Sequence, residues 1–520
     1  MRAYQASLLR ACVSPAHRPI SNSDRQVILK GICMKWLRLL ILTIMLPVIT
    51  GCTLTLLPAA EQGESRSAGN FVTTPPTAAN FPTRPAAQAV LTDSDVYYQA
   101  AANDTYVSLS FIDAQNNIAC QIPPLLFDRG ESIYASSKAA FNGCPGNGSM
   151  IASANRSIVA ISDLAITLAL TESTEIKHNI YQGISHNEAA TDLFVPDLYI
   201  DTVAPSASVY VQNAAGGPNS FELTLLDQAG NVLTTETYEL AQYGVQPLTI
   251  HELLAPVDRV ENGPLTAHIR AANSVATSTV SCRHNLCTAN SAPPQSSTHW
   301  FVPALVSSSQ TPDPLNHYST LTVVNVEEQE ATITVSYGAS SSPTSYRVPA
   351  MGSLHLTTLD FPESFTSNQT VEVQAESPLL VTAQFLNFIN GQGAAYNGMA
   401  IDQGSTELFL RRVTVSESVE SVVYLQNLSE TSAVATLSLY AQAGPDEPAP
   451  EPITITLPEL APLESQSVNI EAYLAHDEPV SWIGAALIQG SAPMSALILT
   501  KSNAEPHWAT GYNAVTTTDE

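Results

Sequence analysis

Short segments of alternating apolar and polar residues run along the chain from about residue 94 onward. FELTLL at 221–226 and ATLSL at 435–439 alternate in this way, and turn-forming residues separate such segments roughly every 8–12 positions. A period of two places one row of side chains in a core and the other in solvent. The pattern therefore predicts β-strands joined by short turns, and an all-β fold class.

Some of these segments recur. VYVQN at 209–213 resembles VYLQN at 423–427, and LTVVN at 321–325 is a looser copy. In the first two, the final asparagine precedes a glycine by 17 positions, at Gly230 and Gly444. Because self-similarity at a fixed period indicates a repeat architecture, these segments predict internal duplication.

Three further segments mark the beginning, middle and end of a repeat. Opening segments are LFVP at 193–196, WFVP at 300–303 and LFL at 408–410. Turn segments lie at 153–158, 270–275, 374–379 and 489–494, at intervals of 117, 104 and 115 residues, and each predicts a hairpin between two apolar strands. Closing segments are YQGI at 181–184, YNGM at 396–399 and YNAV at 512–515, whereas repeat two lacks one. Their recurrence favours a structural role for the tyrosine, packed at the edge of a sandwich.

Each repeat is about 100 residues long, which is typical of an immunoglobulin-like or fibronectin-like sandwich. The alternative of a β-propeller requires shorter repeats, of roughly 40–50 residues. We therefore predict a tandem array of about four antiparallel β-sandwich domains, each with a largely self-sufficient core. One sheet running through repeats three and four would contradict this prediction of separate modules. The predicted domains are a divergent first sandwich at 94–190, followed by 191–292, 299–402 and 407–520.

The N-terminal region carries an export signal. Lys35 and Arg38 begin an apolar stretch that reaches residue 49 and is too short to span a bilayer. It ends in Ile49-Thr50-Gly51-Cys52, which closely resembles a bacterial lipobox. The resemblance implies that the Cys52 thiol receives a diacylglyceryl group and that Cys52 becomes the mature N-terminus. We predict an N-terminal extension and lipoprotein signal peptide at 1–51, with translation starting at Met1 or at Met34.

Residues 52–93 are rich in Pro, Ala and Thr and show no periodicity, so we predict a disordered tether behind the lipidated cysteine. A lipid anchor, a tether and tandem sandwiches together resemble the multi-domain surface proteins of environmental bacteria. The resemblance implies an exported protein that is lipid-anchored to the membrane and faces the extracytoplasmic or extracellular side.

Composition narrows the set of partners. Charged residues are only 13% of the chain, and the formal net charge is −27. Seven of the 20 Lys and Arg residues but only one of the 47 acidic residues lie in 1–51, so the remainder carries −33. Such a surface repels phosphate backbones, which argues against nucleic-acid binding. The predicted partners are the membrane, through the lipid anchor, and as candidates cell-envelope polysaccharide or surface proteins.

The mature chain has four further cysteines, and an even count in an exported protein predicts disulfides. The two local pairs are Cys120 with Cys144, and Cys282 with Cys287. His284 between the second pair offers a metal site as the alternative, but a closed zinc site needs four ligands.

Catalytic motifs are missing from the sequence: we find no nucleophile elbow, no His-Glu-x-x-His and no phosphate-binding loop. We therefore predict a non-enzymatic structural or adhesive surface lipoprotein without cofactor or metal. One alternative is a carbohydrate-binding array, which would need exposed aromatic side chains; of the candidates Trp300, Trp482 and Trp508, we expect the first two in cores. Another alternative is an extracellular hydrolase rich in accessory domains.

Overall fold

The computed structural model describes residues 88–516, all within the compact part of the chain that spans Thr53–Glu520. Short internal segments are not described: 114–117, 137–147, 170–173, 201–206, 258–262, 284–285, 294, 306–317, 339–341, 363–364, 366–368, 443–449, 475–480 and 506. The predicted lipidation site, Cys52, and the predicted signal peptide lie outside the described residues. In the described part of the chain, no helix combines the length and the apolar character needed to cross a membrane.

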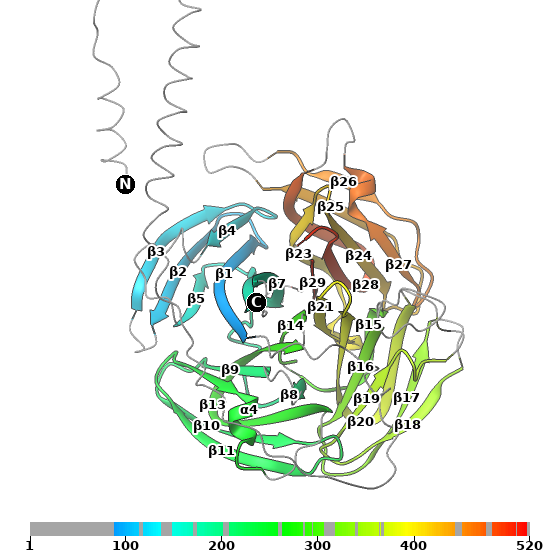
Figure 1. Ribbon diagram of the computed structural model, residues 1–520. Coiled ribbons are helices and arrows are strands. Elements are labelled where there is room, and N and C mark those ends of the chain that lie inside the picture. The colour runs from blue at the N-terminus through cyan, green and yellow to red at the C-terminus, as the bar shows by residue number, and fades with distance from the viewer. Residues whose placement is uncertain are drawn as a thin grey trace, which may run out of the picture. The chain divides into compact units, whose positions relative to one another are not determined.

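The predicted all-β class is confirmed, because the described regular structure is almost entirely antiparallel strand (Figure 1). We group the strands into four repeats. Repeat one consists of β1 (Gln88–Ala100), β2 (Thr105–Asp113), β3 (Ile118–Phe127), β4 (Ser132–Ser136), β5 (Gly148–Ala154), β6 (Ile158–Ala169) and β7 (Thr174–Gln182). Repeat two consists of β8 (Ala190–Ile200), β9 (Ala207–Asn213), β10 (Asn219–Leu226), β11 (Val232–Leu240), β12 (Val245–Thr249), the helix α4 (Ile250–Leu254), β13 (Gly263–Arg283) and β14 (Leu286–Ser291).

The other two repeats follow the same order. Repeat three consists of β15 (Ser297–Leu305), β16 (Tyr318–Asn325), β17 (Ala331–Tyr337), β18 (Thr344–Val348), β19 (Ser353–Thr357), β20 (Gln369–Asn387), β21 (Gln392–Asn397), β22 (Met399–Ala400) and the 3-10 turn η1 (Ile401–Gln403). Repeat four consists of β23 (Ser405–Val415), β24 (Val419–Asn427), β25 (Ala435–Ala441), β26 (Ile453–Thr456), β27 (Ser465–Asn469), the 3-10 turn η2 (Ile470–Tyr473), β28 (Trp482–Ser502) and β29 (Trp508–Asn513).

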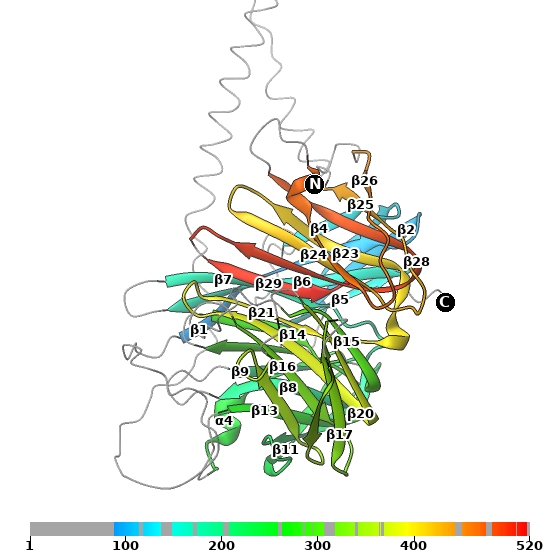
Figure 2. The same ribbon diagram turned by 90° about the vertical axis from the view of Figure 1, so that its right-hand side faces the viewer.

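A long strand organises each of repeats two to four (Figure 2). The first half of β13, β20 or β28 pairs with β10, β17 or β25 on one side and with the opening strand β8, β15 or β23 on the other. The second half pairs with β9, β16 or β24 and with the closing strand β14, β21 or β29. In repeat one, two separate strands replace the long strand. Strand β5 corresponds to its first half and pairs with β2, and β6 corresponds to its second half and pairs with β1 and β7.

The prediction of a hairpin at each turn segment is wrong for repeats two to four. There, residues 270–275, 374–379 and 489–494 lie inside the continuous strands β13, β20 and β28. The apolar stretches before and after each segment do not pair with each other, because each half of the strand pairs with different neighbours. The small and polar residues therefore mark the place where one strand passes from one set of partners to another.

The recurring asparagine at the end of VYVQN, LTVVN and VYLQN fixes two turns at once. Asn213, Asn325 and Asn427 are buried, and each side-chain amide nitrogen donates to backbone carbonyls of two separate turns. Each side-chain oxygen accepts from the backbone N–H two residues later. The asparagine therefore recurs because its short amide side chain can both donate to and accept from the backbone of nearby turns.

Apolar cores extend across the junctions between repeats. The core of repeat three includes Phe194 of repeat two and Leu497 of repeat four, and the core of repeat four includes Ile161 and Ile180 of repeat one. The closing strands of repeats three and four also pair at Gly393 and Ala509, so that one sheet passes through both repeats. The expectation of self-sufficient modules is therefore not met at this junction.

Candidate binding site between the closing strands

The closing strands of all four repeats lie next to one another (Figure 1). Strand β7 contacts β14 and β29, and β21 contacts the same two strands from the other side. The four strands therefore form a closed ring of contacts, in which repeat four returns to repeat one. The close approach of β14 and β21 requires glycine at 393, because a Cβ there would lie 2.6 Å from the carbonyl oxygen of Cys287.

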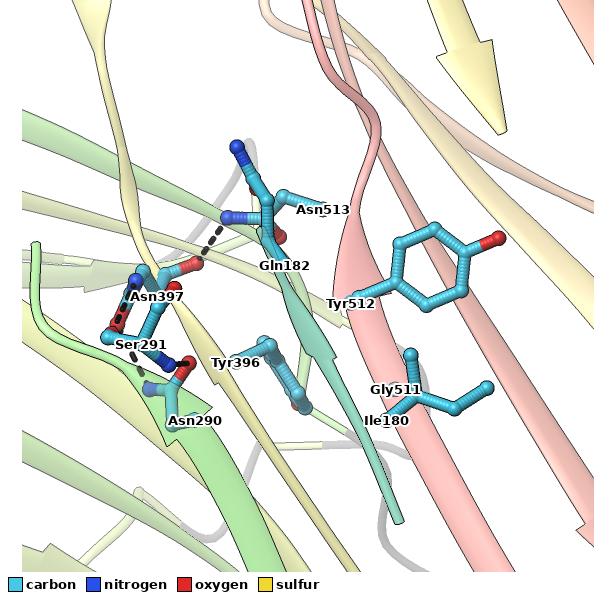
Figure 3. A pocket seen from close by; sticks show the side chains of 9 residues that line it. All are labelled: Ile180, Gln182, Asn290, Ser291, Tyr396, Asn397, Gly511, Tyr512 and Asn513. Atoms are coloured by element: carbon cyan, nitrogen blue, oxygen red, sulfur yellow. Dashed lines mark hydrogen bonds between the residues drawn. The ribbon is translucent and has the colours of Figure 1, made fainter. Parts of the chain in front are cut away.

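A small pocket lies where these strands converge, and every repeat contributes to it (Figure 3). Its lining residues are Ile180 and Gln182 of β7, Asn290 and Ser291 of β14, Tyr396 and Asn397 of β21, and Gly511, Tyr512 and Asn513 of β29. Residues Gln182, Asn397 and Asn513 directly follow the tyrosine of a closing segment. The pocket is therefore built largely from the closing segments, for which the sequence predicted a structural role alone.

Amide side chains connect three of the four strands around this pocket. Asn290 Nδ2 donates to Asn397 Oδ1 at 2.7 Å, and Asn397 Nδ2 donates to the carbonyl oxygen of Ser291 at 3.0 Å. Asn513 Nδ2 donates to the carbonyl oxygen of Asn397 at 2.6 Å. Repeat two was not expected to take part, because its pair Asn290–Ser291 lacks the tyrosine by which the other repeats were recognised.

The chemistry of the pocket suits a water molecule. Asn513 Oδ1 is buried and has no hydrogen-bond partner among the described residues, so it offers an acceptor that a bound water would satisfy. The space between the side chains is sufficient for about one water molecule. An organic substrate does not fit here without movement of the closing strands.

The closing tyrosines hold the opening strand of their own repeat. Tyr396 Oη donates to the carbonyl oxygen of Ala304 at 2.7 Å, and Tyr512 Oη donates to that of Arg412 at 3.0 Å. Burial raises the pKa of Tyr396 and raises the pKa of Tyr512 to about 12, so both remain neutral donors at neutral pH. This role is more specific than the edge packing that the sequence predicted.

The carbonyls of Ala304 and Arg412 that accept from the tyrosines each belong to a β-bulge in an opening strand. The pairing of β8, β15 and β23 shifts register at the dipeptides Pro196–Asp197, Pro303–Ala304 and Arg411–Arg412. A bulge re-aims the side chains of the bulged strand. The second residue of each dipeptide lies at the junction with the following repeat, and repeat four is followed by repeat one in this arrangement.

Arg412 joins repeat four to repeat one. Its guanidinium forms an ion pair with Asp163 of β6 and lies 5.0 Å from the ring centroid of Tyr97 in β1. Asp163 is only 3% exposed and also lies 3.3 Å from Nδ1 of His178. Burial by itself would raise the pKa of Asp163, but Arg412 and His178 together hold it below its ordinary value. The buried carboxylate is therefore ionised at neutral pH.

Asp197 joins repeat two to repeat three. Its backbone has a φ of 59°, which is strained for a residue other than glycine. Thr322 and Thr382 donate their hydroxyls to its two carboxylate oxygens at 2.5 and 2.6 Å. His355 Nδ1 lies 2.9 Å from the Thr322 hydroxyl, and burial lowers the pKa of His355 despite the opposing effect of Asp197. Both carboxylate oxygens of Asp197 are thus bonded to threonines of repeat three, so the acid ties the two repeats together.

Ala304 lies in the apolar core that repeats three and four share. It is fully buried in one cluster with Tyr424 and Leu497. The same position in the repeat thus supplies a carboxylate, a methyl group and a guanidinium at three successive junctions.

Arg411, the first residue of the bulge in β23, is a buried charge that is incompletely hydrogen-bonded within the described part of the chain. It is 1% exposed, and neither Nε nor Nη1 has a hydrogen-bond partner. Burial lowers the pKa of Arg411 to about 9, which still leaves the guanidinium charged at neutral pH. Since an unpaired buried charge destabilises a fold, we expect Arg411→Met to stabilise the protein by about 1–3 kcal/mol.

Thermal unfolding of the full chain would measure this effect as a raised midpoint. The control is Arg347→Met, since Arg347 has a side chain 78% exposed and should leave the midpoint almost unchanged. A lower midpoint for Arg411→Met would contradict the interpretation and would indicate that the guanidinium serves the fold or a ligand.

Of the predicted cysteine sites, one disulfide is present among the described residues. Cys282 and Cys287 are bonded to each other at directly paired positions of β13 and β14. Their sulfur atoms are therefore not thiolate ligands, and the described residues contain no group of His, Cys, Asp and Glu suited to hold a metal. Cys144 and His284 lie outside the described residues, so the pairing of Cys120 in β3 with Cys144 stays a prediction.

The tryptophans do not form a platform for sugars in the described residues. Trp300 is buried, as predicted, while Trp482 is partly buried against the core of repeat four. Trp508 is partly buried too, with its ring 5.5 Å from that of His178. The strongly exposed aromatics in the described residues, Tyr106 and Tyr473, belong to different repeats.

Comparison with known proteins adds little to this description. No protein-family model and no curated protein matches the chain. A solved structure described as Thermotoga maritima 1070 is similar over 20% of this chain and 94% of its own, with 16% sequence identity and a TM-score of 0.18. A similarity of that size carries no argument about fold or function.

Proposed function

We propose that this protein is a lipid-anchored extracytoplasmic structural or adhesive protein that presents β-sandwich repeats at the cell surface. The observation that carries the proposal is Ile49-Thr50-Gly51-Cys52 behind a charged and then apolar stretch. Two acyl chains on Cys52 give a stable membrane anchor where a single chain does not. The partners are the membrane and, at the exposed surface, cell-envelope polysaccharide or other surface proteins.

The construction of the repeats supports a role in display. Neighbouring repeats share apolar cores and are joined by buried polar contacts such as Arg412 with Asp163 and Asp197 with Thr322. Such junctions restrict movement between repeats more than a flexible linker would. A rigid body on a tether is suited to hold a surface away from the membrane.

The finer architecture is part of the same proposal. We infer that each repeat is a variant of an immunoglobulin-like sandwich, with one sheet around the first half of the long strand and another around its second half. The pairing of β13, β20 and β28 with separate partners at their two ends supports this assignment. Repeat one follows the pattern with two strands in place of one.

The anchoring step can be tested in cells with the full chain. We expect Cys52→Ser to abolish labelling by a palmitate analogue and to move the protein from the membrane fraction to the soluble fraction, because its acylated thiol is the proposed attachment. The matched control is Thr55→Ser, a conservative change just after the lipobox that should label like the unaltered protein. Equal labelling of the Cys52 variant and the unaltered protein would contradict the proposal.

A further inference from the structure

Two histidines lie at the junction between repeats two and three, where β8 of repeat two contacts β16 and β20 of repeat three. His268 of β13 stacks on Phe194 with ring centroids 4.1 Å apart, and Phe194 is a β8 residue that packs in the core of repeat three. His355 of β19 has its Nδ1 2.9 Å from the hydroxyl of Thr322 in β16. Each of the two repeats therefore contributes one imidazole to this junction.

Each imidazole also lies near a carboxylate of β8. His268 Nε2 is 2.7 Å from Asp192 Oδ1, and His355 Nδ1 is 3.8 Å from Asp197 Oδ1. The two histidine side chains are 5% and 12% exposed, whereas the other two histidine–carboxylate pairs of the described residues have histidines that are 24% and 33% exposed. The junction between repeats two and three therefore holds the most deeply buried pairs of this kind in the described part of the chain.

The hydrogen bonds determine where a proton adds to His355. Thr322 has one hydroxyl hydrogen and donates it to Asp197, so its oxygen accepts from His355 and the imidazole hydrogen lies on Nδ1. An added proton therefore goes to Nε2, and it converts a mostly buried side chain into a cation.

A charge on His355 is unfavourable in the folded protein. The charged groups around it are Asp197 of β8, Asp360 after β19, and the guanidinium of Arg283 in β13. Burial has the largest effect and lowers the pKa of His355, and Arg283 lowers it further, while the two carboxylates oppose this change.

The same balance holds for His268. Its charged neighbours are Asp192 of β8, Glu222 of β10 and Arg270 of β13. Burial again has the largest effect and lowers the pKa of His268, against the opposing effect of the two carboxylates. The side chain of Asp192 is 59% exposed, so solvent screens the attraction that would otherwise favour the charged imidazole.

Buried histidines of this kind weaken a junction in acid. An opened junction lets each imidazole take up a proton near its ordinary pKa of about 6.5, whereas the closed junction excludes that proton. Stability is therefore complete above that pH and is lost as the pH falls from about 6.5 through the folded-state pKa. The pKa values of the carboxylates Asp163 and Glu372 lie below 3.8 and 4.5, so their contributions are lost only at lower pH.

We propose that His268 and His355 form a pH-sensitive switch that loosens the junction between repeats two and three in mild acid, before the other described junctions. Ser353, two residues before His355, donates its N–H to the carbonyl oxygen of Gln228 in repeat two at 2.9 Å. Loosening at His355 therefore reaches a second contact between the repeats. Separation of the repeats withdraws Phe194 from the core of repeat three and exposes apolar surface. The switch does not depend on the lipid anchor.

Hydrogen exchange of the full chain at about pH 7 and about pH 5.5 tests the order in which the junctions loosen. After correction for the intrinsic pH dependence of exchange, we expect protection in β8 and β19 to fall by about tenfold or more in acid. The reason is that each histidine shifts the opening equilibrium by up to about tenfold per pH unit below 6.5. Protection in β7 and β29, where repeats four and one meet, should fall less. Equal loss at both junctions, or no loss at either, would overturn the proposal.

Two substitutions keep the hydrogen bonds but cannot take up the proton. His268→Gln places an amide near the position of Nε2, and His355→Asn places one near the position of Nδ1. We expect the double variant to lose the difference in protection between the two pH values. The matched control is His251→Gln, which alters an exposed side chain of α4 and should keep the full difference.

A difference that persists undiminished in the double variant would contradict the assignment of the switch to these histidines. If the double variant does not fold at neutral pH, the two single variants are compared in the same way. Each should lose part of the difference, and an unreduced difference in both would equally overturn the proposal.

Discussion

Asp163→Asn is expected to lower the free energy of unfolding by about 3–5 kcal/mol at neutral pH, because it leaves the partly buried Arg412 guanidinium without its counter-charge. The carboxylate is buried and also lies within hydrogen-bond reach of His178, so little solvent screens its interactions. Urea denaturation of the full chain, followed by circular dichroism, would measure the loss. Asp192→Asn is the matched control, since Asp192 also bonds a histidine but has a side chain 59% exposed.

The same pair predicts a pH dependence with a definite sign. Arg412 and His178 hold the folded-state pKa of Asp163 below its ordinary value of 3.8, against the effect of burial. A lowered pKa contributes stability that is complete above the unfolded-state value and is lost as the pH falls through the folded-state value. The gap in stability between the unaltered protein and Asp163→Asn should therefore close as the pH falls below about 4. A gap that persists in strong acid, or one no larger than that of Asp192→Asn at neutral pH, would contradict the ion-pair argument.

Tyr396→Ala is expected to destabilise the protein by about 3–5 kcal/mol, since it removes a fully buried aromatic ring from the core of repeat three. Tyr396→Phe keeps the ring and removes only the donor to the buried carbonyl of Ala304, so its expected cost is about 1–2 kcal/mol. Thermal unfolding of both variants separates packing from hydrogen bonding. The control Tyr473→Phe alters an exposed ring and should have little effect. Equal midpoints for Tyr396→Phe and the unaltered protein would mean that the hydroxyl does not hold the bulge.

Local pattern predicted the strand class and the repeats because both depend on short-range rules. Period-two alternation predicted the strand β10, whose burial also alternates over most of its length. The same local rules failed at the turn segments, since small polar residues suit a hairpin as well as a crossing strand, and only the distant partners decide between them. In the same way, the sequence showed that the closing tyrosines recur, but it did not indicate that their hydroxyls donate to the carbonyls of Ala304 and Arg412.

No short sequence motif indicated which residues join one repeat to the next. Arg412 and Asp163 are 249 residues apart, and nothing in either neighbourhood indicates the other. The one usable signal was position: Asp197, Ala304 and Arg412 all lie three residues after the phenylalanine of an opening segment. Without a known bulge, this shared offset gives no reason to expect that the three side chains contact the following repeat. The pocket was missed for a related reason, because it needs four strands that no single repeat contains.

The closed ring of contacts has a consequence for the order of folding. Contacts such as Lys177 with His507 and Ile180 with Thr510 join residues 330 positions apart, so repeat four must be synthesised before they can form. Until then, Ile161 and Ile180 of repeat one lack the core that buries them in the finished protein. Long-range contacts of this kind slow folding and prolong the exposure of apolar surface. The synthesis of repeat four thus sets the moment at which repeat one becomes protected from aggregation.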